Sequence, residues 1–422
     1  MPNAPRTGLV WVVSIFLPLG GGYFLSFLYR SINAMIAPQL VADLGLSPGQ
    51  LGFVTAIYFL SFGLFQIPLG VLLDHYGPAR VQSTLLGVAA AGAVLFSMGD
   101  TIGLLTLGRG LIGLGVAGAL MSSFTAFALW LPTRHLPLAN GCLMGFGGLG
   151  AFAATKPVEW ALTMTDWRGL FLVLAAMTAG VAILIAVCLP RSEKKGGPIG
   201  FGAQLKAVAT IYRDRLFWRL APLTVASLAA GLSIQGLWAG TWLRDVAGLA
   251  PDAVTTHLSL IAIGLTVGPV LSGATASLVR RAGFSLLQLL GTMACLYMSL
   301  QVMIILEWVS ISYLLWAGFG LLINTLALPY AILSQAFPQA LAGRVNTSLN
   351  LLMIIGAFAC QYLIGWIIGF WPLTPNGGYA AEAYQAGFGL LLGFQFLSFL
   401  WFLFNRSQKP NVASQTPAGT DS

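Results

Sequence analysis

Long apolar segments follow one another along almost the whole chain, separated by short polar turns. About 20 mostly apolar residues can cross the hydrocarbon core of a membrane as a helix, because every backbone amide is then satisfied within its own segment. Only 8% of the residues are charged, whereas an average soluble domain carries roughly 25%. The sequence therefore predicts an all-α membrane protein.

Twelve transmembrane helices can be placed on this pattern. The predicted helices cover residues 9–36, 50–73, 82–100, 104–130, 139–161, 169–190, 217–241, 257–280, 286–308, 312–335, 344–370 and 386–405. The second has a recognisable start, because Ser47, Pro48 and Gln50 supply a hydroxyl N-cap, a proline at the first helical position and a glutamine three residues on. The first segment is too long for a cleaved signal peptide, so we expect it to remain as a membrane helix.

The longest polar stretch, residues 191–215, lies at the midpoint of the chain. The sequence GVLLDHYGPARVQSTLLG after the second helix is also echoed by GATASLVRRAGFSLLQLLG after the eighth. Two pseudo-symmetric six-helix halves are the parallel-repeat plan of one large class of transporters. We predict a first half at 1–190, a cytoplasmic linker at 191–216, a second half at 217–405 and a disordered tail at 406–422.

The charged residues divide between the two sides of the predicted bundle. Alternate loops collect most of the lysines and arginines, whereas the opposite loops hold Asp43, Asp100, Asp166, Asp245, Asp252 and Glu382 with only two arginines. Because short cytoplasmic loops are enriched in Lys and Arg, both termini are predicted to be cytoplasmic and the chain to lie in the cytoplasmic (inner) membrane. The same asymmetry accounts for the net charge of +8, so we expect a lipid bilayer and no nucleic acid as partner.

The sequence offers no recognisable reaction centre. The four cysteines are far apart in apolar segments, where we interpret them as buried small side chains, and the three histidines are isolated. No nucleophile, base and orienting group occur at a familiar spacing. We therefore predict no catalytic residue, no metal site and no cofactor, and we expect a protein that is not an enzyme.

The stretch GVLLDHYGPAR, residues 70–80, resembles the signature loop G-x-x-x-D-R-x-G-R of the major facilitator superfamily. Gly70, Asp74 and Gly77 match that loop, and the twelve-helix plan extends the resemblance over essentially the whole chain. The match is incomplete, because His75 replaces the usual basic residue and Arg80 is the one full cation left.

The resemblance implies that Gly70, Asp74, Gly77 and Arg80 form a conformational gate. Asp74 would lie near the N-terminus of the eleventh helix when the cytoplasmic side is closed, where the helix dipole favours an anion by about 0.3–1 kcal/mol. The alternative is that these charged residues only solvate a tight turn.

Four charged residues are conspicuous inside the predicted membrane helices: Arg30, Arg109, Lys156 and Glu159. A charge near the bilayer centre costs roughly 2.5–3.5 kcal/mol, so such residues generally face a cavity or a partner. Arg30 is roughly two thirds of the way across the first helix, and its planar fork suits a carboxylate or phosphate. The alternative for Arg30 is that it snorkels to the outer headgroups.

The remaining interior charges have two interpretations each. Arg109 is either tied to proton coupling, as the family resemblance implies, or it snorkels or makes a structural hydrogen bond near its helix start. Lys156 and Glu159 share a helix face, so they either neutralise each other or divide the work, with Lys156 contacting an anion and Glu159 taking up a proton. Gln235 and Asn324, in the seventh and tenth helices, are further candidates for hydrogen bonds to a substrate.

These observations predict a secondary active transporter that moves a small organic anion by alternating access, coupled to protons and acting as a monomer. Its substrate-binding residues would be Arg30, Lys156, Gln235 and Asn324, and its coupling residues Arg109 and Glu159. The alternative is a proton-driven exporter of amphipathic drugs or metabolites, and a third possibility is a membrane sensor or assembly factor that kept the fold and lost transport.

Overall fold

The computed structural model describes residues 11–190, 208–375 and 377–405. The N-terminal half consists of η1 (Val12–Phe16), α2 (Leu17–Ser31), α3 (Asn33–Leu44), α4 (Pro48–Tyr76), α5 (Pro78–Ser97), α6 (Ile102–Val116), α7 (Ala119–Trp130), η2 (Thr133–His135), α8 (Leu136–Ala153), α9 (Lys156–Met164) and α10 (Trp167–Cys188). Most of the predicted linker and the whole predicted tail lie outside the described residues.

The C-terminal half has the same kind of architecture. It consists of α12 (Arg215–Ser233), η3 (Ile234–Trp238), α13 (Ala239–Asp245), α14 (Pro251–Arg281), α15 (Leu286–Ile305), η4 (Val309–Ile311), α16 (Ser312–Ile323), η5 (Asn324–Ala327), α17 (Leu328–Ala336), α18 (Gln339–Ile368) and α19 (Ala381–Phe404). In the described ranges the only β-type pairing is an isolated bridge between Leu373 and Tyr379. The prediction of an all-α fold is confirmed.

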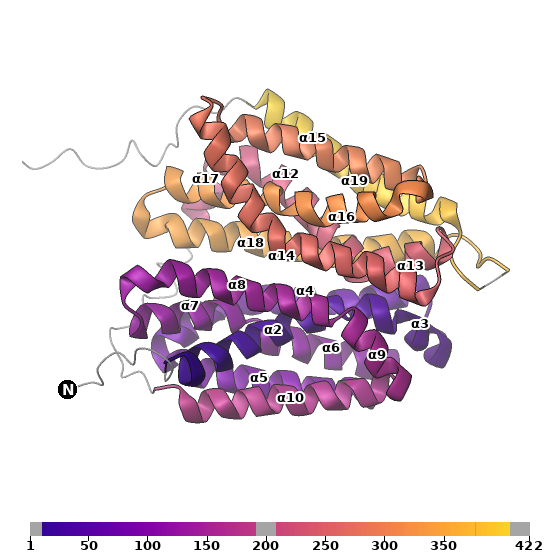
Figure 1. Ribbon diagram of the computed structural model, residues 1–422, viewed down its shortest axis with the longest axis horizontal. Coiled ribbons are helices and arrows are strands. Elements are labelled where there is room, and N and C mark those ends of the chain that lie inside the picture. The colour runs from indigo at the N-terminus through magenta and orange to yellow at the C-terminus, as the bar shows by residue number, and fades with distance from the viewer. Residues whose placement is uncertain (1–10, 191–207, 376, 406–422) are drawn as a thin grey trace, which may run out of the picture.

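The two halves lie side by side with their helices along the long axis of the molecule (Figure 1). At one end the helices stop beside Arg80, Arg134, Arg280 and Arg281, and we call it the basic end. The opposite end carries Asp43, Asp100, Asp166 and Asp252, and we call it the acidic end. In the view of Figure 1, α3, α9 and α13 mark the acidic end at the right.

Eleven helices of the described chain are long and apolar enough to cross a membrane, and the bent pair Leu138–Ala153 and Lys156–Met164 makes a twelfth if it counts as one span. Each lies on a predicted segment, so the spans are confirmed. The predicted cap of the second is also present, since Gln50 N donates to Ser47 Oγ at 3.3 Å and Ser47 N donates to Gln50 Oε1 at 2.9 Å. The first span runs further than predicted, through α3 to Leu44.

Several spans are interrupted where the sequence predicted continuous helices. The first changes from α2 to α3 at Ile32, and the seventh contains the π-helical turn η3. In the fourth, α6 ends at Val116 and α7 starts at Ala119, and Gln66 Nε2 donates to the Ala117 carbonyl at 3.0 Å. A side chain from α4 thus satisfies a carbonyl that the broken helix leaves unpaired.

The surface of the bundle is apolar, as a lipid-facing surface must be. Val187 at the end of α10 is 77% exposed and Phe404 at the end of α19 is 80% exposed. Cys142 and Cys295 are also exposed, and Cys188 and Cys360 are partly buried. The prediction that all four cysteines are buried is therefore wrong, because small apolar side chains are equally tolerated on a surface that meets lipid.

The two halves meet closely at the acidic end through glycines. A Cβ placed on Gly240 of α13 would lie 3.1 Å from the Ala34 carbonyl oxygen of α3, and one on Gly52 of α4 would lie 3.0 Å from the Gln361 carbonyl oxygen of α18. Gly365 of α18 is packed in the same way against the carbonyl of Pro48. No side chain fits between the main chains at these points.

Toward the basic end, glycines of α4, α8, α14 and α18 have open space beside them. A Cβ on Gly70 of α4, Gly145 of α8, Gly273 of α14 or Gly343 of α18 would find no atom within 4 Å. The close glycine contacts between the halves therefore lie at the acidic end, whereas these glycines toward the basic end have no atom of the other half beside them.

Candidate functional site

Arg30 lies inside the bundle, at the junction between the two halves. It belongs to the last turn of α2, and its Cζ is 4.7 Å from the ring centre of Phe27 and 5.3 Å from that of Phe62. Its Nε is buried and has no hydrogen-bond partner among the described residues. Because the guanidinium is held over aromatic rings, Arg30 does not snorkel to the headgroups.

The break after α2 shapes the main chain beside Arg30. Asn33, the first residue of α3, donates from Nδ2 to the Arg30 carbonyl oxygen at 3.3 Å. The Asn33 Oδ1 atom is buried without a partner in the described chain. The start of α3 therefore carries an unpaired amide oxygen three residues after Arg30.

Two glutamines of the C-terminal half, Gln235 and Gln361, lie near the main chain of Arg30 and Ser31. Gln235, in the π-helical turn η3, donates from Nε2 to Ser31 Oγ at 3.2 Å, so it contacts the residue after Arg30. A Cβ on the adjacent Gly236 would lie 3.6 Å from the Arg30 carbonyl oxygen and 3.8 Å from Gln361 Oε1. The small residue thus allows the main chain at Arg30 and the amide of Gln361 to approach each other.

Arg30 has no carboxylate to neutralise it. Every described aspartate and glutamate lies in a loop or within the terminal turns of a helix, and the two ion pairs seen there join Lys156 to Asp252 and Arg168 to Asp43. An uncompensated guanidinium in a low-dielectric interior attracts an anion strongly. We call Arg30, Asn33, Gln235 and Gln361 the central site.

Arg109 binds the main chain next to the central site. It is completely buried, its Nη1 donates to the Tyr29 carbonyl oxygen at 3.3 Å, and its Cζ is 4.5 Å from the ring centre of Phe96 and 5.0 Å from that of Phe171. Among the interpretations of Arg109, this contact supports the structural hydrogen bond. The bond fixes the main chain one residue before Arg30.

Lys156 and Glu159 lie away from the central site. The predicted fifth helix is broken at residues 154–155 and bends by 44°, so Lys156 starts the separate helix α9 at the acidic end. Lys156 Nζ lies 3.0 Å from Asp252 Oδ1 of α14, and the two side chains are 49% and 82% exposed. The structure thus pairs Lys156 across the two halves instead of with Glu159, which is partly buried and makes no ion pair or side-chain hydrogen bond in the described chain.

A buried hydrogen bond accompanies this ion pair. Ser259 Oγ of α14 donates to Thr155 Oγ1 at 2.9 Å, and Thr155 directly precedes Lys156. We call Thr155, Lys156, Asp252 and Ser259 the acidic-end gate, because these four side chains join the halves at the closed end of the molecule.

Replacing Lys156 with alanine is expected to change the affinity for an anion by less than about fivefold, because exposed ion pairs contribute up to about 1 kcal/mol. Asp252→Ala removes the same pair from the other side and should give the same small change. Binding isotherms of both variants in detergent check this. A large loss in Lys156→Ala alone would instead show that Lys156 contacts the anion.

Asn324 faces a different part of the C-terminal half. Its Nδ2 donates to the Leu265 carbonyl oxygen at 3.3 Å, and it lines a pocket of about 360 Å³ together with Ser277, Arg280 and Gln335. It makes no hydrogen bond to a central-site residue in the described chain. The role of Asn324 in substrate binding stays a prediction.

Gly77, the glycine between α4 and α5, has a backbone conformation that favours glycine. Gly77 has φ +77° and ψ 163°, which side chains disfavour, and it both ends α4 and precedes α5. Gly70 lies within α4, and Asp74 and Arg80 are exposed, without an ion pair or a side-chain hydrogen bond among the described residues. This is compatible with a latch that has separated at the open end, and the gating role of the loop stays a prediction.

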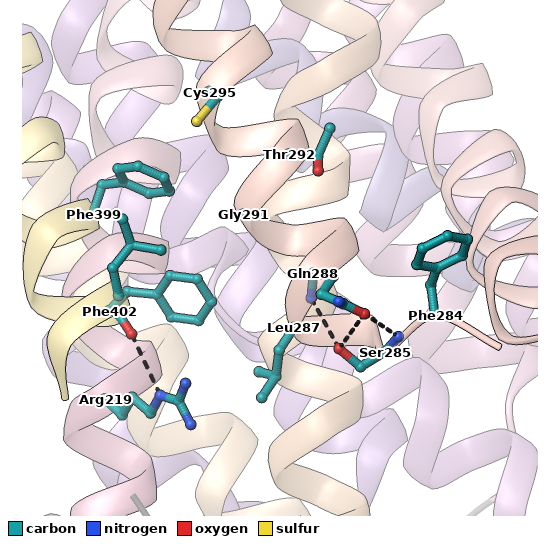
Figure 2. Close-up of a pocket in the computed structure, with 11 residues that line it drawn as sticks. Arg219, Phe284, Ser285, Leu287, Gln288, Gly291, Thr292, Cys295, Phe399 and Phe402 are labelled. Atoms are coloured by element: carbon teal, nitrogen blue, oxygen red, sulfur yellow. Dashed lines mark hydrogen bonds between the residues drawn. The ribbon is translucent and has the colours of Figure 1, made fainter. Parts of the chain in front are cut away.

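A larger pocket of about 780 Å³ lies elsewhere, between α12, α15 and α19 near the basic end (Figure 2). Arg219 donates from Nε to the Phe402 carbonyl oxygen at 3.4 Å, and Ser285 and Gln288 form a capping box at the start of α15. None of the central-site residues lines this pocket. We therefore do not assign it to the transported solute.

Two sequence signals for the central site were weak. In the sequence, Gln361 is only one of several polar residues in the apolar helices of the second half, and Asn33 directly follows the Ser31-Ile32 pair without any motif. Their significance depends on contacts between halves that are about 200 residues or more apart, for example the bond from Gln235 to Ser31.

Comparison with known proteins adds an independent finding. Residues 19–359 match the family model described as Major Facilitator Superfamily. A probable sulfoacetate transporter of Cupriavidus necator is 29% identical over 269 residues, which cover 59% of this chain and 62% of that protein. A hexuronate transporter of Escherichia coli is 25% identical over 293 residues, covering 65% of this chain and 66% of that protein.

The aligned stretches thus span less than two thirds of the length of these relatives. Among solved structures, a bacterial homologue of the human lysosomal transporter Spinster, in an inward-facing and unoccupied conformation, superposes with a TM-score of 0.74 at 17% identity. The superposition covers 96% of this chain and all of that one. At this identity the likeness concerns the fold.

Proposed function

Since the chain belongs to the Major Facilitator Superfamily, a family of membrane transport proteins rather than enzymes, we propose that it is a secondary transporter of small organic anions. It would work by alternating access, with the two halves rocking about the central site. With the basic end in the cytoplasm of a bacterial inner membrane, the described state is open inward. A single chain holds the whole central site, so the proposal includes transport by the monomer.

The observation that carries this proposal is the uncompensated guanidinium of Arg30 at the junction of the halves. Arg30 is held by two aromatic rings and has no described carboxylate partner. A carboxylate on the substrate would supply the missing charge through paired N–H···O bonds. A cationic drug would be repelled, which argues against the exporter of amphipathic cations.

The relatives support the same chemistry. Sulfoacetate carries a carboxylate and a sulfonate, and hexuronates are sugar carboxylates, so the named substrates of both relatives are organic anions. Their site residues are not carried over to this chain. The support is that similar chains are transporters for the class of molecule that Arg30 suits.

Proton coupling is the finer part of the proposal. Glu159 is the carboxylate for this role, because it lies one turn after Lys156 in α9, is partly buried and has no ion pair among the described residues. Uptake of a proton there would change the charge beside the acidic-end gate. Arg109 would then contribute by holding the main chain before Arg30.

The test is uptake of radiolabelled glucuronate and sulfoacetate into proteoliposomes with and without an imposed pH gradient. Saturable uptake of either anion into proteoliposomes, absent from protein-free liposomes and without protein-dependent uptake of tetraphenylphosphonium, is the expected result. Stimulation by the gradient in wild type but not in Glu159→Gln would establish the coupling. If cations are transported and anions are not, the proposal is wrong.

A further inference from the structure

We propose that Gln361 recognises a hydroxyl group of the substrate, next to the carboxylate that Arg30 binds, so that hydroxylated organic acids are preferred over their deoxy counterparts. This inference rests on the proposed function and narrows the substrate class of the same site.

The main chain at Gln361 is fixed from both halves. Its carbonyl oxygen accepts a hydrogen bond from Trp238 Nε1 at 3.2 Å, and it lies 3.0 Å from the position of a Cβ on Gly52. The side-chain oxygen of Gln361 lies 3.8 Å from the position of a Cβ on Gly236, which is itself 3.6 Å from the Arg30 carbonyl oxygen. The amide of Gln361 therefore lies near the main chain of Arg30, separated from it by Gly236.

The amide of Gln361 has no partner in this state. The side chain is completely buried, and neither Nε2 nor Oε1 forms a hydrogen bond in the described chain. Leaving a buried polar group unpaired costs about 1–3 kcal/mol. This cost is removed only when a ligand or a water molecule forms hydrogen bonds with the Gln361 amide.

A second buried glutamine pair in the same half shows the contrast. Gln301 Nε2 donates to Gln395 Oε1 at 2.9 Å, and Gln395 Nε2 donates to Gln301 Oε1 at 2.8 Å. Both side chains are buried and fully engaged with each other. The two glutamines that join α15 to α19 thus satisfy one another, whereas Gln361 does not.

The chemistry of an amide complements that of a hydroxyl group. Gln361 offers a donor and an acceptor side by side, and a hydroxyl both donates and accepts, whereas an ionised carboxylate only accepts. Arg30 provides donors for the carboxylate, and Asn33, whose Nδ2 donates to the Arg30 carbonyl oxygen, has an unpaired Oδ1 that adds an acceptor. When the acidic end opens, the contact between Gly52 and Gln361 must separate, and the amide would then face the entering substrate.

The experiment compares D-glucuronate with cyclohexanecarboxylate, which share a six-membered ring and one carboxylate. Dissociation constants are measured by thermal shift or calorimetry on full-length protein in detergent. We expect wild type to bind glucuronate at least about tenfold more tightly, because a site with unpaired polar groups penalises a ligand that lacks the hydroxyls. In Gln361→Leu the affinity for glucuronate should fall about tenfold and that for cyclohexanecarboxylate should stay within about twofold.

The control is the double variant Gln301→Leu/Gln395→Leu, which removes a buried glutamine pair from the same half and should keep the wild-type preference. If Gln361→Leu weakens both anions equally, or neither, the inference is overturned while the proposed function stands. If wild type binds neither anion but binds other solutes, the proposed function itself fails. The two failures are thereby distinguishable.

Discussion

Replacing Arg30 with alanine is expected to abolish saturable anion transport and to lower anion affinity about 100-fold or more. The reason is that a charged, bidentate hydrogen-bond pair is lost from the central site, in which Arg30 is the one cation. Arg30→Lys keeps the charge but loses the planar fork, so we expect an intermediate affinity. Uptake into proteoliposomes and binding in detergent measure the two effects separately.

A matched control for Arg30 is Arg168→Ala. Arg168 is also an arginine beside an aromatic ring, 4.2 Å from the ring centre of Trp167, but it pairs with Asp43 at 3.0 Å at the acidic end. Its removal should leave anion affinity unchanged. Equal losses in both variants would mean that general positive charge, and not the central site, determines anion binding.

Cross-linking the acidic-end gate is expected to stop transport completely. Thr155 and Ser259 lie on opposite halves with their hydroxyl oxygens 2.9 Å apart, so cysteines at these two positions should form a disulfide under oxidising conditions. The bond would hold the acidic end closed while the basic end stays open. Uptake into proteoliposomes should disappear on oxidation and return when a reductant is added.

The cross-linking experiment needs a background in which Cys142, Cys188, Cys295 and Cys360 are replaced by serine or alanine, because all four are free thiols. The single variants Thr155→Cys and Ser259→Cys should transport normally under both conditions. Anion binding from the basic side should persist in the oxidised double variant. Undiminished transport by a fully cross-linked protein would rule out alternating access through this end.

The spans could be predicted from the sequence because their physical cause is local. Each span satisfies its own backbone, and the second span also has a cap whose residues lie within four positions of one another, Ser47 to Gln50. The interruptions could not be predicted in this way. The break in the fourth helix at Ala117 is stabilised by Gln66, which lies 51 residues earlier in the chain.

The same distinction applies to the candidate site. Arg30 and Gln235 were identified because a charge or amide within an apolar helix is conspicuous by itself, and the structure brings both to the junction of the halves. Lys156 was equally conspicuous, yet the bend before α9 carries it to an ion pair with Asp252 at the acidic end. Gln361 is a candidate only because its buried side-chain amide has no hydrogen-bond partner in the described chain, and no sequence pattern reveals this.

The glycines that close the acidic end have a consequence for permeability. At Gly52, Gly240 and Gly365 the main chains of the two halves meet directly, so backbone atoms form part of the seal together with the side chains of the acidic-end gate. Such a seal excludes hydrated ions by size and needs no electrostatic barrier. Because any replacement at these positions adds volume, mutations there would push the two halves apart at the acidic end. The protein would then leak inorganic ions and dissipate the membrane potential on which its host cell depends.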